Sequence, residues 1–436
     1  MSGAREVALD VIFRVAEEGA YSSLVLPAAL RRANLDARDR DLVTELTYGT
    51  LRRLRRLDDA IGRFSDRPVD RMTPHARALL RLGAYQILDM RIPAHAAVSE
   101  TVELAEGRER GFVNAVLRKV SADRPALPSG PGDDAIGVRT GMSTWAVREL
   151  RLLLGDETEE AAAAFAQRPP LCVRANACAQ SPDELERAFR DSGLEPRRGS
   201  IASDCVLVEG AVVERLPGYA QGWFAVQDQA SAFVATALGA QPGERVLDLC
   251  AGPGGKAGAI ACAVGIEGAL VAADAAPKRA RLVRTGLDRL QLPGAVLAQD
   301  ARHPALRPGR FDRVLVDAPC SGIGSARRRP ELLWRPDRAR LSQLARLQVE
   351  IAGAAADLLK PGGMLLYSVC TFPRAETDAV CDALARRHPE LQPQAIEGPD
   401  GPSARIRLWP HRDGTDGMFL AAFRKGEVPG ASGGKA

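Results

Sequence analysis

The sequence predicts a mainly α/β protein in which a doubly wound parallel sheet follows an all-helical N-terminal domain and a small α+β segment. Strand-like apolar runs alternate with helical patterns from about Gln227 onward. A glycine-rich turn, between Gly252 and Gly255, follows the first of these strands. Cys320 and Cys370 stand at the ends of later strands, and in such a sheet ligands bind outside the carboxyl ends of the strands.

Composition along the chain predicts five stretches. Apolar residues repeat at helical spacing from about residue 4 to 120, and Thr73 with Pro74 gives one later helix a capping hydroxyl and a proline at its first position. A stretch rich in proline, glycine and charge follows. The predicted divisions are a helical domain at 1–122, a linker at 123–140, a connecting α+β domain at 141–226, the α/β domain at 227–426 and a flexible tail at 427–436.

The periodicity of apolar residues places the elements in order. In the connecting domain we expect helices at Trp145–Leu154 and Asp183–Ser192 and strands at Leu171–Arg174 and Cys205–Val208. In the α/β domain we expect strands at Arg245–Leu249, Ala269–Ala273, Ala295–Ala298, Arg313–Val316 and Met364–Val369, with helices after Gly255, at Pro277–Leu290 and at Asp337–Leu359. A last apolar run, Met418–Phe423, is expected to add an edge strand.

The bulk properties are those of a globular chain, with 436 residues, 46% hydrophobic and 26% charged. A net charge of +4 is too small to imply nucleic acid by itself, but arginines cluster at 52–56 and 327–329. The eight cysteines show neither a disulfide framework nor metal-ligand spacing, and no zinc is expected. The N-terminus lacks a signal-peptide core and no run reaches membrane-spanning length, so a reducing cytoplasm is expected.

The run VLDLCAGPGGK, which ends at Lys256, reads as a strand, a tight turn and the start of a helix. Glycines let a ligand approach the backbone, and a helix N-terminus offers N–H groups to an anion. A P-loop is excluded, because Ala251 replaces its first glycine and Ala257 its Ser or Thr. A dinucleotide and S-adenosylmethionine both remain compatible, and Asp274, which ends the second strand, would hold the ribose hydroxyls.

Acidic residues end or follow the first four strands of the α/β domain. They are Asp248, Asp274, Asp300 and Asp317. Buried carboxylates cost free energy unless they hold a ligand or a partner, so the series favours a ligand site at this edge of the sheet. For S-adenosylmethionine, Asp300 would reach the adenine.

A thiolate beside such a cofactor is needed when the carbon to be modified is a poor nucleophile, as C5 of cytosine is. Addition of the thiolate to C6 makes C5 an enamine carbon that can attack the methyl group of a sulfonium. A free thiol has a pKa of about 8.5, so the site must favour the anion, and Lys256 is one candidate for that. An amino-group methyltransferase would need no thiol and would carry Pro-Pro-aromatic where this chain has Ala318-Pro319-Cys320.

The remaining cysteines are expected to be ordinary core residues, apart from Cys250, which lies in the cofactor loop. The core set is Cys172, Cys178, Cys205, Cys262 and Cys381.

Three segments resemble the RNA (cytosine-5) methyltransferase family. Asp248–Lys256 resembles its cofactor loop, and Asp317–Gly322 and Tyr367–Thr371 resemble its two cysteine motifs, in the same order. Asp41–Arg52 and Gly111–Arg118 are similar to the NusB-like RNA-binding domain. This combination resembles the RsmB (Sun/Fmu) branch, which methylates a cytosine in small-subunit ribosomal RNA.

The resemblance implies a role for each matching residue. Cys370 would be the nucleophile, Cys320 would assist release of the methylated base, and Asp317 would sit against the N3 edge of the cytosine and the cofactor. S-adenosyl-L-methionine would be held by Cys250, Ala251, Gly252, Pro253, Gly254, Gly255, Lys256, Asp274, Asp300 and Asp317. One departure is Ala257, where the family usually has Ser or Thr, and it puts one hydrogen bond in doubt.

The substrate would be a base that leaves its stack, in a loop or an opened helix. Phosphate contacts are expected from Arg327, Arg328, Arg329 and Arg335, while Trp334 would stack a base or pack in the core. The implied partner is ribosomal RNA, free or in a partly assembled particle, bound by a monomer without metal or membrane. An NAD-dependent oxidoreductase and a non-enzymatic RNA-binding or antitermination factor remain alternatives, which binding of S-adenosylhomocysteine, NADH and RNA would separate.

Overall fold

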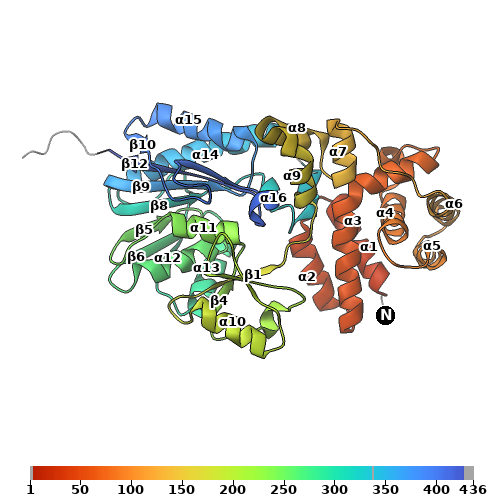
Figure 1. The fold of residues 1–436 in the computed structure, drawn as a ribbon, viewed down its shortest axis with the longest axis horizontal. Coiled ribbons are helices and arrows are strands. Elements are labelled where there is room, and N and C mark those ends of the chain that lie inside the picture. Colours follow the sequence, from red (N-terminus) through yellow and green to blue (C-terminus); the bar gives the residue numbers. More distant parts are fainter. Residues whose placement is uncertain (1–2, 336–337, 427–436) are drawn as a thin grey trace, which may run out of the picture. The chain divides into compact units, whose positions relative to one another are not determined.

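A computed structural model describes residues 3–335 and 338–426, and the predicted tail at 427–436 lies outside this part. The chain forms two compact units (Figure 1). The first consists of Met1–Arg168 with Ser325–Pro336, and the second of Pro169–Gly324 with Asp337–Ala436. These boundaries differ from the predicted ones, because 141–168 and a segment of the predicted α/β domain both belong to the first unit.

The first unit is helical, as predicted for its first 122 residues. Each long helix buries one face, as in α3, where Val43, Leu46 and Leu57 are fully buried. The helices are α1 (Ala4–Ala16), α2 (Ser22–Arg32), α3 (Ala37–Phe64), α4 (Pro74–Leu88), α5 (Ala94–Glu103), α6 (Glu109–Ala122), α7 (Asp133–Thr140), α8 (Thr144–Leu154) and α9 (Thr158–Phe165), with a 3-10 turn η5 (Pro330–Leu333).

The predicted linker at 123–140 is wrong in its second half, which is helix α7. Asp133 lies in the first turn of α7, where an acidic side chain favours the helix N-terminus. Gly141, with a φ of 78°, ends the helix in the left-handed conformation that glycine allows. Ile136 and Val138 are buried. The proline- and glycine-rich composition upstream hid this short pattern.

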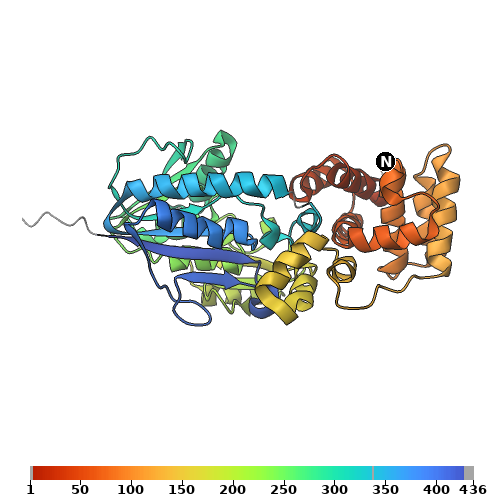
Figure 2. The ribbon, with the colours of Figure 1, turned by 90° about the horizontal axis from the view of Figure 1, so that it is seen from above.

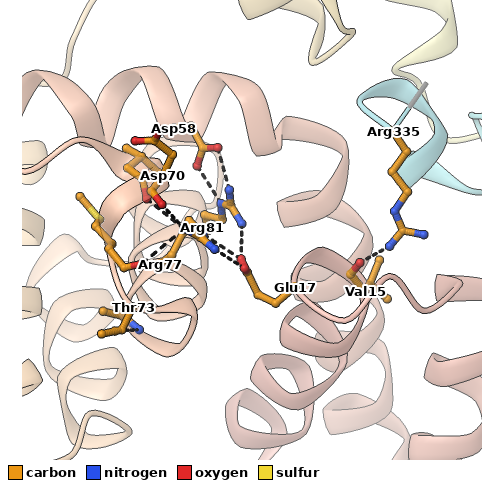
Figure 3. Close-up of polar contacts among 11 residues, drawn as sticks. Val15, Glu17, Asp58, Asp70, Thr73, Arg77, Arg81 and Arg335 are labelled. Atoms are coloured by element: carbon orange, nitrogen blue, oxygen red, sulfur yellow. Dashed lines mark hydrogen bonds and ion pairs between the residues drawn. The ribbon is translucent and has the colours of Figure 1, made fainter. Parts of the chain in front are cut away.

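A partly buried ionic cluster joins α1, α3 and α4 (Figure 3). Glu17, next to the end of α1, accepts hydrogen bonds from Arg77 Nε and Arg81 Nη1, both at 2.9 Å. Arg81 also donates to both carboxylate oxygens of Asp58, at 2.7 and 2.8 Å. Burial raises the pKa of Glu17, but the two guanidinium groups outweigh burial and its pKa is lowered overall. The turn that follows α1 is therefore held in place by charge.

The second unit contains two sheets. The small one has the order β2-β3-β1-β4, and the large one β10-β12-β9-β8-β5-β6-β7 with β11 paired to β12. Strands β5 to β9 are parallel, as the alternation of strands and helices predicts. The strands are β1 (Leu171–Ala175), β2 (Arg197–Arg198), β3 (Cys205–Val208), β4 (Phe224–Val226), β5 (Arg245–Asp248), β6 (Ala269–Asp274), β7 (Ala295–Ala298), β8 (Phe311–Asp317), β9 (Leu359–Val369), β10 (Leu391–Pro393), β11 (Arg405–Leu408) and β12 (Met418–Lys425).

Helices cover both faces of the large sheet (Figures 1 and 2). Alternate residues of one strand enter opposite cores: Val314 and Val316 pack with α14 and α15, while Leu315 packs with α11, α12 and α13. The helices of this unit are α10 (Pro182–Asp191), α11 (Gln229–Ala237), α12 (Gly255–Val264), α13 (Pro277–Arg289), α14 (Arg338–Leu358), α15 (Asp378–Arg387) and α16 (Pro410–Asp413). The sheet is thus buried on both sides and exposes its strand ends for function.

The last apolar run was predicted as an edge strand, and this is wrong. Strand β12 lies inside the sheet, antiparallel to β9 on one side and to β10 and β11 on the other. All six residues from Met418 to Phe423 are buried. A run that is apolar on both faces is typical of an interior strand, whereas an edge strand has a polar face.

A disulfide joins Cys178, after β1, to Cys262 in α12, with 5.8 Å between their Cα atoms. The prediction that the cysteines form no disulfide framework, and that these two are core residues, is therefore wrong. The two residues are 84 positions apart, and only the tertiary fold brings them together. Cys172, Cys205 and Cys381 are buried, as expected. In the described part of the chain no helix could cross a membrane.

Candidate active site

The glycine turn after β5 has no room for a side chain at Gly252 or Gly254. A Cβ atom on Gly252 would lie 2.4 Å from Oδ2 of Asp274, and one on Gly254 would lie 3.0 Å from Cα of Val283. Gly254 also has a φ of 111° and stands at the N-cap of α12. The turn therefore presents bare backbone and the N-terminus of α12 to the end of the sheet.

A cavity of about 270 Å³ opens at this turn. It is lined by the whole predicted loop from Cys250 to Lys256, together with Asp317. Asp248 also lines it. The sequence marks Asp248 as an acid at the end of a strand, but it is not among the predicted site residues. The other lining residues could not be found from motif spacing, because they come from β4, α11, α13 and the residues next to these elements. They are Ala225, Val226, Gln227, Asp228, Ser231, Gly286, Arg289 and Leu290.

Asp248 has the most unusual environment in the cavity. Its side chain is fully buried, and neither carboxylate oxygen has a hydrogen-bond partner of standard geometry among the described residues. Burial, and then the carboxylate of Asp317, raise the pKa of Asp248 to about 7. A buried acid without a donor fits a ligand that brings a cation. S-adenosylmethionine carries an ammonium and a sulfonium, and its carboxylate fits the N-terminus of α12, so the residues present fit this cofactor.

Lys256 and Asp317 form an ion pair across the cavity, with 2.6 Å between Nζ and Oδ2. The second oxygen of Asp317 accepts a hydrogen bond from Ser368 Oγ at 2.9 Å. Burial alone would lower the pKa of Lys256, but the carboxylate of Asp317 outweighs burial, and Cys370 and Asp248 act in the same direction, so its pKa is raised. Lys256 therefore stays charged at neutral pH.

The two cysteines predicted as catalytic lie together, with 3.5 Å between their sulfur atoms. Strands β8 and β9 are parallel and Asp317 pairs with Ser368, so the residues that follow them leave the sheet side by side. The hydrogen bond to Cys370 and burial raise the pKa of Cys320 well above its usual value. Cys320 is therefore held as a thiol. Both cysteines lie outside the lining of the cofactor cavity, which they adjoin through Asp317.

Two buried polar residues hold the Cys320 loop and were missed in the sequence. Gln348 of α14 donates to the carbonyl of Pro319 at 2.9 Å and to Glu376 at 3.0 Å. The same Glu376 oxygen accepts from the backbone N–H of Ser321 at 2.9 Å. Glu376 is fully buried, and burial raises its pKa. No spacing rule marks such residues, because each reaches the loop from a distant element.

The two acids predicted to hold the nucleoside do not line the cavity. Asp274 accepts hydrogen bonds from the N–H groups of Gly252 and Ala276, at 3.1 and 2.9 Å, and pairs with Arg279 at 3.2 Å. Asp300 is bound to Arg302, whose guanidinium lowers the pKa of Asp300 to about 2. Both stand at the expected strand ends, and their contacts with the cofactor remain predictions.

The arginines predicted to contact RNA lie in the first unit. Arg327 is buried, and its carbonyl accepts from Arg52 Nη2 at 3.0 Å. Arg335 donates to carbonyl groups of the helical unit, including that of Ala20 at 2.9 Å. Arg328 and Arg329 are half-buried. Contact of these residues with RNA stays a prediction.

Comparison with known proteins supports this description of the fold. Residues 2–122 match the model of the NusB family, 142–214 that of a ferredoxin-like domain of RsmF/B-like methyltransferases, and 235–424 that of the 16S rRNA methyltransferase RsmB/F. A solved structure with a TM-score of 0.84, covering 97% of this chain and 99% of its own, is 24% identical and has the same fold. A methyltransferase homologue from Pyrococcus horikoshii is 27% identical, with a TM-score of 0.59, over 68% of this chain and all of its own.

Fold and site together define a methyltransferase that uses S-adenosylmethionine. Full-length relatives then give the family. "Putative methyltransferase" of Mycobacterium tuberculosis is 39% identical over 97% of this chain and 96% of its own. "Ribosomal RNA small subunit methyltransferase B" of Vibrio cholerae is 34% identical over 97% of each chain. The chain belongs to the RsmB/F methyltransferase family. No group of side chains suited to a metal ion occurs among residues 3–335 and 338–426.

Proposed function

We propose that this protein methylates C5 of a cytosine in small-subunit ribosomal RNA, through a transient bond between Cys370 and C6 of the base. The observation that supports this proposal is the pair of sulfur atoms 3.5 Å apart beside Asp317, which lines the cofactor cavity. Amine or oxygen methylation needs no thiol, whereas carbon methylation of a pyrimidine does. The substrate is inferred from relatives named as small-subunit ribosomal RNA methyltransferases.

The reaction begins with an electron pair from the thiolate of Cys370, which forms a bond to C6 and makes C5 nucleophilic. Bound S-adenosylmethionine supplies an electrophilic methyl group. C5 would take up that methyl group as the bond between the methyl carbon and the sulfonium breaks, and the electron pair of that bond would stay on the sulfur of S-adenosylhomocysteine. C5 would then lose its proton. The electron pair of the C5–H bond restores the C5–C6 double bond as the bond between sulfur and C6 breaks and the sulfur leaves with its pair.

The surroundings of the thiols favour different roles for them. The charged Lys256 interacts electrostatically with Cys370 and favours its thiolate. Cys320 stays protonated beside Cys370, so it can give a proton to the departing sulfur while it accepts the proton from C5. Asp317, fixed by Lys256 and Ser368, would meet the N3 edge of the cytosine. We therefore propose that Cys370 is the nucleophile and that Cys320 assists release of the methylated base.

Two variants test these roles with the full chain, S-adenosylmethionine and small-subunit RNA. Cys370→Ala should abolish both methylation and attachment of RNA. Cys320→Ala should accumulate protein that carries RNA on a denaturing gel, because the adduct forms but is not released. The matched control is Cys381→Ala, which removes a buried thiol from α15 outside the site. Reversed behaviour of the first two variants would overturn the assignment of the nucleophile.

The site of modification is mapped in the cell. Bisulfite sequencing of ribosomal RNA from a deletion strain should show one cytosine that loses its methyl group, and complementation should restore it. We propose that the reaction takes place in the cytoplasm, on naked RNA or on a partly assembled particle, with a monomeric enzyme. Of the predicted RNA contacts, the half-buried Arg328 and Arg329 are the ones to test first.

A further inference from the structure

The segment Ser325–Pro336, which follows the Cys320 motif along the chain, is an integral part of the helical unit. Glu331 and Leu333 are fully buried, and Trp334 packs against the helical core. A backbone hydrogen bond also holds the segment, because Ser143 donates its N–H to the carbonyl of Leu333 at 2.7 Å. Complete burial of a carboxylate requires partners, and these identify what the segment does.

Glu331 caps helix α2. The N-cap residue of α2, Tyr21, makes no side-chain cap hydrogen bond. Glu331 instead accepts the N–H of Ser22 at 3.0 Å and its hydroxyl at 2.7 Å, one with each carboxylate oxygen. A negative charge at a helix N-terminus satisfies an unpaired donor and complements the helix dipole. The segment therefore provides a cap that α2 lacks in its own sequence.

Arg335 places a positive charge at the C-terminal end of α1 (Figure 3). Its guanidinium donates to the carbonyl of Val15, in the last turn of α1, and to that of Ala20 at 2.9 Å. A cation is favoured where a helix leaves carbonyl groups unpaired. Beside it, Trp334 Nε1 donates to the carbonyl of Leu51 in α3 at 3.0 Å. One short segment thus contacts three helices through complementary polar groups.

The residue just before this segment is bound to the catalytic motifs. Gly324 donates its N–H to the carbonyl of Cys370 at 3.0 Å and accepts from the N–H of Gly417 at 2.8 Å. A Cβ atom on Gly324 would lie 2.1 Å from the carbonyl oxygen of Gly417, so the backbone is tightly enclosed. Ser325, the first residue held by the helical unit, follows directly. A single peptide bond therefore links Gly324, whose N–H is bonded to the carbonyl of Cys370, to the segment that the helical unit holds.

We propose that Glu331, Trp334 and Arg335 are positioning residues: they fasten the segment to the helical unit and thereby keep Cys320 in register with Cys370. This inference rests on the proposed function, because it assigns the helical unit a part in release of the methylated base. The helical unit then acts on the chemistry through the covalent chain, whatever RNA it binds.

The test measures turnover and RNA adduct in full-length Glu331→Ala, with Trp334→Phe as a milder variant that keeps the packing and loses the hydrogen bond to Leu51. A small displacement of a catalytic group costs about a hundredfold in rate. We expect kcat to fall at least about tenfold, RNA adduct to accumulate as in Cys320→Ala, and the dissociation constant of S-adenosylmethionine to change less than about twofold. Ser22→Ala, which alters the same contact from the helical side, should show the same pattern.

The matched control is Thr101→Val, which loses a fully buried hydrogen bond to the carbonyl of Ala97 in the same unit, away from the segment. It should lower the melting temperature without accumulating adduct. If Glu331→Ala turns over like the wild type, or if Thr101→Val accumulates adduct equally, the positioning proposal is overturned. If Cys320→Ala itself accumulates no adduct, the proposed function is overturned. Adduct in Cys320→Ala but not in Glu331→Ala or Trp334→Phe rejects the positioning role alone.

Discussion

Replacement of Asp248 by asparagine tests whether this buried carboxylate receives the cationic part of S-adenosylmethionine. The change keeps the size and shape of the side chain, removes its charge and replaces one acceptor oxygen by an NH2 group. A hydrogen bond to a charged group contributes about 1.5–3 kcal/mol, and 1.4 kcal/mol corresponds to about a factor of ten. Since Asp248 has no hydrogen-bond partner of standard geometry among the described side chains and backbone groups, the cofactor would be the donor. We expect the dissociation constant to rise roughly ten- to a hundredfold.

The same carboxylate predicts how cofactor binding depends on pH. Its pKa is raised to about 7, so it is largely protonated below that pH and cannot pair with a cation. Affinity should therefore fall as the pH falls, by about tenfold between pH 8 and pH 6, if one group of this pKa must ionise. Asp248→Asn should bind with little change over this range. Isothermal titration calorimetry with S-adenosylmethionine at several pH values measures both effects.

Stability separates loss of the charge from misfolding. An acid whose pKa is higher in the folded than in the unfolded chain favours folding at low pH, and this contribution is lost as the pH rises through the folded value of about 7. Asp248→Asn should thus be as stable as the wild type at pH 8, or more stable. The matched control is Asp312→Asn, near the N-terminal end of β8, which removes a charge that pairs with Lys360. It should leave the binding of S-adenosylmethionine unchanged. An Asp248→Asn variant with wild-type affinity and pH dependence would refute the reasoning.

Three further predictions concern the site and the second unit. Gly252→Ala should weaken binding of S-adenosylmethionine at least about tenfold in calorimetry, because its Cβ would lie 2.4 Å from Asp274 Oδ2 and displace the loop. Unchanged affinity would contradict a role of the glycine turn in binding the cofactor. Tyr367→Phe, which loses a buried hydroxyl bonded to the carbonyl of Glu376 at 2.7 Å, should lower the unfolding free energy by about 1–2 kcal/mol in urea titrations. Cys178→Ser, which opens a disulfide of 84-residue separation, should cost about 2–4 kcal/mol under oxidising conditions and nothing under reducing ones, and an equal loss in both would contradict the crosslink.

Much of the fold follows from local pattern. The strands β5 to β9 and the helices α12, α13 and α14 were predicted, although the predicted β9 begins five residues late and α15 was missed. The alternation of apolar runs with helical periods is a property of neighbouring residues and can be seen in the sequence. The same holds for the strand-end positions of Asp317, Cys320 and Cys370. Parallel strands put their carboxyl ends at one edge, so order along the chain was enough to predict that these groups lie near one another.

Sequence-based predictions failed where segments that are distant in the sequence become neighbours in the fold. The interior place of β12, the bond between Cys178 and Cys262, and the reach of Gln348 and Glu376 to the Cys320 loop depend on which elements become neighbours. No short-range pattern encodes such a choice, because the free energy of packing is gained only after the chain has folded.

The amino-acid sequence by itself determined the methyltransferase family and its cofactor, because the motifs that carry the resemblance are recognised from residue type and order. Only the tertiary structure decided that Asp248 has no hydrogen-bond partner of standard geometry among the described residues, and that the segment after the cysteine motif belongs to the helical unit. Only the folded chain shows that Arg335, predicted from the sequence as a phosphate contact, donates to three carbonyl groups near the end of α1. Its contact with RNA stays a prediction. Burial and pairing are properties of the assembled neighbourhood, and they set the charge and the freedom of each functional group.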